Sequence, residues 1–115
     1  MIGVGMGAGA IDFRHLEHYV GGDEAIIREV LALFSEQART VLTLLDPAGP
    51  GDRWCDAAHC LKGSALGIGA SALAEACGEA ELARDAPSEH KQAARARIAK
   101  CLGEALSDIA LYTAR

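Results

Sequence analysis

Hydrophobic residues recur at three- and four-residue steps over most of the chain, a spacing that is typical of amphipathic helices. Residues 12–20 predict a short first helix and residues 23–45 a long second one, and each begins with an aspartate that can cap its first turn. The apolar stripe of the second helix consists of Ile26, Ile27, Val30, Phe34, Val41, Leu42 and Leu45. Gly21-Gly22 and residues 46–51, which are rich in proline and glycine, interrupt the pattern and predict loops.

The same spacing predicts three further helices. They span residues 52–66, 71–86 and 88 onward. Ser71 or a neighbour is expected to cap the first turn of the fourth helix, Pro87 to stop that helix, and Ser88 to cap the last one. Their apolar stripes are Trp54, Ala58, Leu61 and Ala65; Leu73, Cys77, Ala80 and Leu82; and Ile98, Leu102, Ala105, Ile109 and Tyr112. Because short connections make consecutive helices antiparallel neighbours, residues 11–115 predict an all-α, up-down-up-down four-helix bundle with a short additional N-terminal helix.

Composition narrows the class of protein. Half of the residues are hydrophobic but only 4% are aromatic, and the alanine- and leucine-rich content suits helices better than strands. The formal net charge of -5 argues against a nucleic-acid partner, and no apolar run approaches the roughly 18 residues of a membrane span.

Residues 1–10 lack the features of a signal peptide and predict a flexible glycine-rich tail. The four cysteines form no Cys-x-x-Cys pair, which favours free thiols and a cytoplasmic location.

His59 lies on the third predicted helix but outside its apolar stripe, so its ring is expected at the surface. An exposed histidine is largely neutral at cytosolic pH and can act as a nucleophile. Lys62, three residues later, can reach the same surface. Gly63, four residues later, costs the helix roughly 1 kcal/mol relative to alanine, and open space beside the imidazole is a candidate for its purpose. Ser64 adds a hydroxyl nearby, in a less favourable direction.

The run His59-Cys60-Leu61-Lys62-Gly63-Ser64-Ala65 resembles the signature of histidine-containing phosphotransfer (HPt) domains, in which His-x-Leu-Lys-Gly-Ser-Ala precedes a small-residue turn and another helix. The flanks Ile11-Asp12, Gly22-Asp23 and Gly69-Ala70 also resemble the family, so the resemblance covers nearly all of the chain beyond residue 10.

The resemblance implies a role for each matching residue. His59 would accept the phosphoryl group, Lys62 would hold its oxygens and Gly63 would give clearance. Glu81 falls where the family uses Gln or Glu to bond the other ring nitrogen, and Arg84 would add positive charge nearby. A docking patch would include Cys55, Leu66, Ser64 and Arg84, together with parts of the first two helices.

The resemblance also implies partners. These would be receiver domains of response regulators, which carry the Mg²⁺, and hybrid histidine kinases. The chain itself would need no cofactor. Since it has no ATP-binding segment and no receiver-type acidic pocket, we expect a phosphocarrier and not a kinase.

Several alternatives compete with this interpretation. A receiver-binding adaptor or inhibitor without phosphotransfer would keep the docking face. A metal-binding or purely structural four-helix bundle is the second rival, and it predicts inward-facing Glu and His pairs at three-residue spacing. Cys55 and His59 lie one turn apart, but Cys60 points about 100° away from His59, so no metal site is expected. Three single-residue alternatives also stay open: Gly63 could serve helix packing, Glu81 could be a surface carboxylate, and Trp54 can be a core residue or part of the docking patch. His15, His18 and His90 are expected to be ordinary surface or packing histidines.

Overall fold

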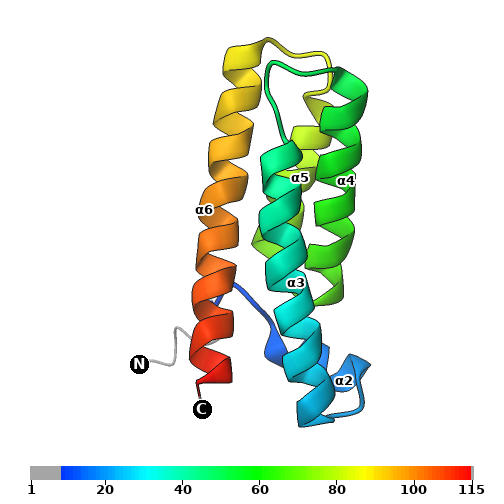
Figure 1. Cartoon of the computed structure of the whole chain (residues 1–115), viewed down its shortest axis with the longest axis vertical. Helices are drawn as coiled ribbons and strands as arrows, with labels where there is room; N and C mark the ends of the chain where they lie inside the picture. Colours follow the sequence, from blue (N-terminus) through cyan, green and yellow to red (C-terminus); the bar gives the residue numbers. More distant parts are fainter. Residues whose placement is uncertain (1–8, 115) are drawn as a thin grey trace.

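In a computed structural model that describes residues 9–114, the chain forms helices and no strand. The helices are α2 (Phe13–Tyr19), α3 (Glu24–Leu44), α4 (Gly51–Gly67), α5 (Ser71–Leu82) and α6 (Ser88–Thr113). The four longer ones run alternately up and down, and α2 lies across the end of the bundle where α3 begins (Figure 1). The predicted four-helix bundle with a short N-terminal helix is therefore confirmed. The predicted tail falls mainly on residues 1–8, which lie outside the described residues.

Side-chain caps start the first two helices as expected. Asp12 accepts hydrogen bonds from the N–H groups of Arg14 and His15, and Asp23 does the same at the start of α3. The predicted serine caps of α5 and α6 are wrong. Ser71 and Ser88 are the first helical residues, and neither N-cap residue makes a side-chain cap bond. The N-cap residue has a non-helical backbone, and here the N-cap residues are Ala70 and Pro87, which precede the two serines.

Helix α5 ends at Leu82, four residues earlier than its pattern predicts. In a continuing helix the Ala80 carbonyl would accept from the N–H of Arg84. Instead it accepts from the N–H of Ala83 at 3.0 Å and from the indole Nε1 of Trp54 at 2.7 Å. The tight turn and the bond from α4 together end the helix.

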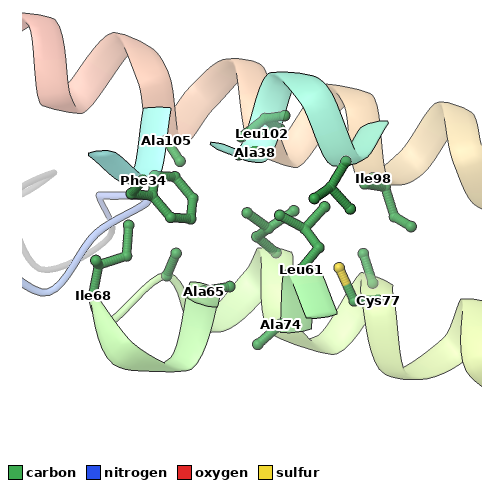
Figure 2. Packing of buried hydrophobic residues seen from close by; sticks show 14 of the residues in the cluster. Phe34, Ala38, Leu61, Ala65, Ile68, Ala74, Cys77, Ile98, Leu102 and Ala105 are labelled. Carbon is green, nitrogen blue, oxygen red and sulfur yellow. The ribbon is translucent and has the colours of Figure 1, made fainter. Parts of the chain in front are cut away.

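The core lies between the four long helices and combines many alanines with larger aliphatic and aromatic side chains. Figure 2 shows Phe34 and Ala38 of α3 near Leu61 and Ala65 of α4, with side chains of α5 and α6 completing the cluster. The predicted stripes of α4 and α6 are buried throughout. Two expected core residues are exposed instead: Ile26 by 45% and Leu82 by 89%. On α3 the buried face also includes Leu31 and Ala38, which rotates it away from Ile26.

Two arginines hold α3 and α6 together at opposite ends. Near the start of α6, Arg95 donates to the carbonyls of Leu45 and Leu42 at 2.9 and 3.1 Å. Near the start of α3, Arg28 donates to the carbonyl of Thr113 at 2.8 Å. Each guanidinium thus satisfies carbonyls at the negative end of the neighbouring antiparallel helix.

The turn between α4 and α5 depends on Gly69. Its φ of +77° lies in the left-handed region, and a Cβ there would come 2.8 Å from the carbonyl oxygen of Asp12. The backbone N–H of Asp12 donates to the Gly69 carbonyl at 2.9 Å. The turn therefore sits directly against the start of α2, and only a residue without a side chain fits.

We expect Gly69→Ala to lower the free energy of unfolding by about 3 kcal/mol, because it combines a left-handed alanine with a backbone clash. Gly21→Ala is the matched control. Gly21 has a φ of +71°, but a Cβ at this position would meet nothing within 4 Å, so the substitution should cost only about 1 kcal/mol. Denaturant unfolding measures both values, and equal losses would contradict the close approach to Asp12.

Candidate functional site

The imidazole of His59 projects from the middle of α4 into solvent. Its side chain is 76% exposed, while Ala58 and Leu61 on the same helix are almost fully buried. The prediction that His59 lies outside the packed seam is confirmed. An exposed ring on a rigid helix can be approached by a partner protein without any rearrangement of the core.

Glu81, on the last turn of α5, links His59 to Lys62. Its Oε2 lies 3.1 Å from Nδ1 of His59, and its Oε1 lies 3.4 Å from Nζ of Lys62. An ionised carboxylate can only accept hydrogen bonds, so Nδ1 of His59 donates. The lone pair of the neutral ring is then on Nε2, the nitrogen that remains free to attack. The structure thus brings His59, Lys62 and Glu81 together, and the Glu81 side chain is 22% exposed.

Two glycines lie beside this group, Gly63 next to open space and Gly78 against the Lys62 side chain. A Cβ at Gly63 would meet no atom within 4 Å, apart from its own helix backbone and chain neighbours, so the interpretation of Gly63 as a packing glycine is wrong. A Cβ at Gly78 on α5 would lie 3.8 Å from Nζ of Lys62. The Lys62 chain therefore lies close to Gly78 as it reaches Glu81. Gly78 was not predicted from the sequence, although the signal that singles out Gly63, a costly glycine inside a helix, applies to it equally.

The four residues predicted for docking do not form one group. Leu66 is 54% exposed, and Ser64 lines an apolar hollow of about 270 Å³ between α2, α3 and α4. Cys55 is half-buried and directs its thiol to the carbonyl of Glu81 at 3.6 Å. Arg84 forms ion pairs with Asp52 and Asp85. Leu66 and Ser64 therefore lie at a surface suited to docking, whereas Cys55 and Arg84 make contacts between α4 and the end of α5. A docking role for any of them stays a prediction.

The hollow is also lined by Gly67, where an added Cβ would meet nothing within 4 Å. Its rim includes two exposed hydrophobic side chains, Tyr19 at 77% and Leu33 at 61%. Exposed apolar side chains around a shallow hollow are typical of protein-binding surfaces.

Cys77 is buried one turn before Glu81. Burial raises the pKa of its thiol to about 12, and the negative charge of Glu81 adds to the effect. The thiol is therefore neutral at physiological pH and acts as a small core residue. Cys60, in contrast, is exposed.

The raised pKa of Cys77 predicts a specific loss of stability in alkali. The fold retains a proton that the unfolded chain releases above pH 9, so the contribution is complete below pH 9 and disappears as pH rises toward 12. We expect the stability difference between wild type and Cys77→Ala to shrink over this range by at most about 4 kcal/mol. Unfolding free energies of wild type and Cys77→Ala at matched pH values measure it, and a difference that stays constant from pH 9 to pH 12 would contradict the prediction.

Other candidate chemistry is not supported within residues 9–114. This part of the chain holds no group of three or more His, Cys, Asp or Glu residues arranged to bind a metal ion. None of its helices combines the length and apolarity needed to cross a membrane. His15 stacks on Tyr19 at the surface, and His18 and His90 are exposed.

Comparisons of the chain with family models and with solved structures point to the same family. The family model described as Hpt domain matches residues 29–110. The crystal structure of histidine phosphotransferase ShpA from Caulobacter crescentus is 43% identical, covers 91% of each chain and has a TM-score of 0.73. A putative histidine-containing phosphotransfer protein from rice shares the fold, with a TM-score of 0.81, 22% identity and coverage of 93% of this chain and 81% of the other. Among curated proteins, no significant match was found.

Proposed function

Because the chain belongs to the Hpt domain family, we propose that it relays phosphoryl groups between aspartates of receiver domains through a phosphohistidine at His59. The observation that carries the proposal is the exposed ring whose Nδ1 donates to Glu81, which leaves Nε2 as the nucleophile. The partners would be response-regulator receiver domains and a hybrid histidine kinase, in the cytoplasm. The chain would act as a phosphocarrier and not as a kinase.

The chemistry is a displacement at phosphorus. The Nε2 lone pair attacks the phosphorus of the receiver's aspartyl phosphate, an N–P bond forms, the P–O bond breaks and the aspartate leaves as a carboxylate. The ring gains positive character while Nδ1 keeps its proton, and the carboxylate of Glu81 stabilises that charge. Mg²⁺ held by the receiver would neutralise the phosphoryl oxygens, and the reverse reaction would pass the group to another receiver.

Lys62 and Gly63 would serve this transfer from either side of the ring. Before transfer the ammonium of Lys62 is paired with Glu81, and the Lys62 side chain is 39% exposed. A phosphoryl group on Nε2 would offer a stronger anionic partner, so we expect Lys62 to turn from the carboxylate to the phosphoryl oxygens. Gly63 would leave room for the receiver's active site.

The receiver would dock over the hollow between α2, α3 and α4, next to Leu66. Its exposed apolar side chains would be covered in the complex. Partners that exchange phosphoryl groups must also separate, so a small buried area is expected.

The test mixes the chain with a receiver domain that carries a labelled phosphoryl group. The label should move to the chain, in a linkage that acid hydrolyses and alkali does not, and a second receiver should then remove it. Binding is measured separately by titration. A chain that binds the receiver but never gains label would be an adaptor or inhibitor, and the relay proposal would be wrong.

A further inference from the structure

The end of α5 that carries Glu81 is held against the first turns of α4. Two consecutive α4 residues donate to two consecutive carbonyls of α5: Nε1 of Trp54 to Ala80 at 2.7 Å, and Sγ of Cys55 to Glu81 at 3.6 Å. A Cβ at Gly51 would come 3.0 Å from the carbonyl oxygen of Arg84. The start of α4 therefore contacts the chain just before, at and just after Glu81.

The bond from Trp54 is the strongest of these contacts. The residue is 1% exposed, so its N–H bond forms where water does not compete. The ammonium of Lys91, near the start of α6, lies 5.5 Å from the centre of the indole ring and adds a cation–π contact. The indole is thus fixed by neighbours on two other helices, and its N–H points in one direction.

Glu81 needs such an anchor because it is the second-last residue of α5. Terminal helical turns fray unless tertiary contacts hold them. The contact between Oε2 of Glu81 and Nδ1 of His59, at 3.1 Å, spans two helices and would be lost by a small rotation of that turn. A donor that fixes the carbonyl of the preceding residue, Ala80, fixes the direction in which the Glu81 side chain leaves the backbone.

We propose that Trp54 is a positioning residue for the phosphoryl-acceptor site: through the Ala80 carbonyl, its indole N–H holds Glu81 where it keeps His59 in the Nδ1–H form. The link to phosphotransfer rests on the proposed function of His59. The link to the state of the ring does not.

The test variant is Trp54→Phe, which removes the donor but retains an aromatic ring. It leaves no orphaned acceptor, because the Ala80 carbonyl still accepts from the N–H of Ala83. The matched control is Lys91→Met, which removes the cation over the same ring and leaves the indole N–H in place. Cys55→Ala, which removes the weaker neighbouring bond from Sγ to the Glu81 carbonyl, is the second variant to use if Trp54→Phe does not fold.

The first measurement is ¹⁵N NMR of the His59 imidazole in the full chain. We expect the Nδ1–H form in wild type and Lys91→Met, and a shift toward the Nε2–H form in Trp54→Phe and, more weakly, in Cys55→Ala.

The second measurement is the rate of label transfer from the phosphorylated receiver. It should fall about tenfold in Trp54→Phe. In a Glu81→Ala background the same substitution should change it by less than about twofold.

An unchanged ring form and rate in Trp54→Phe would overturn the proposal. So would an equal change in Lys91→Met, because local loosening would then account for both. If wild type accepts no label, the proposed function fails, and the NMR comparison alone decides whether Trp54 positions Glu81.

Discussion

Replacing His59 with glutamine is expected to abolish phosphoryl transfer to the chain without weakening the fold. An amide nitrogen has no available lone pair, so the variant lacks the nucleophile, and loss of such a group costs several orders of magnitude in rate. The side chain is 76% exposed and lies outside the core, so the free energy of unfolding should change by less than about 0.5 kcal/mol. Label transfer and denaturant unfolding measure the two quantities.

His90→Gln is the control for this result. His90 is an exposed histidine in the first turn of α6, and its replacement should leave transfer at the wild-type rate. Label that still reaches His59→Gln would place the acceptor on another side chain. A variant that loses transfer and also unfolds more easily would indicate that His59 supports the structure, and the exposed ring argues against this.

The sequence pattern was sufficient to predict the bundle and the position of His59. Helical spacing separates the buried stripe of Trp54, Ala58, Leu61 and Ala65 from a histidine outside it, and this inference needs only the geometry of one helix. The contact between His59 and Glu81 could be proposed only from the family resemblance. It joins two helices, and no local pattern reports how far one helix rotates or slides against another.

The wrong predictions arise from the same limit. Leu82 fits the apolar periodicity of α5, but the tight turn at Ala83 and the bond from Trp54 end the helix beside it and leave it exposed. Ile26 fits the stripe of α3, yet Leu31 and Ala38 define the buried face. In both cases the arrangement of the helix in the bundle decides which of several apolar residues is buried.

Substitutions at Gly63 are expected to change stability and activity in opposite directions. The glycine lies inside α4 with open space around it, so Gly63→Ala should raise the free energy of unfolding by about 1 kcal/mol. Gly63→Leu should also stabilise the helix, since leucine is nearly as good a helix former. Its side chain, however, would stand one turn from His59 on the same face and occupy the space that an approaching receiver needs. We expect label transfer to fall about a hundredfold.

Gly103→Leu separates the two effects. Gly103 also lies inside a long helix, α6, is exposed and has nothing within 4 Å of a Cβ, so it should show the same gain in stability. None of the three site residues His59, Lys62 and Glu81 is on α6, and transfer should stay at the wild-type rate. Because both substitutions add the same side chain to the same kind of position, a difference in transfer rate can only come from what stands next to His59. Equal rates in the two variants would mean that the space beside the ring is not used for docking, and that the glycine has no part in the transfer.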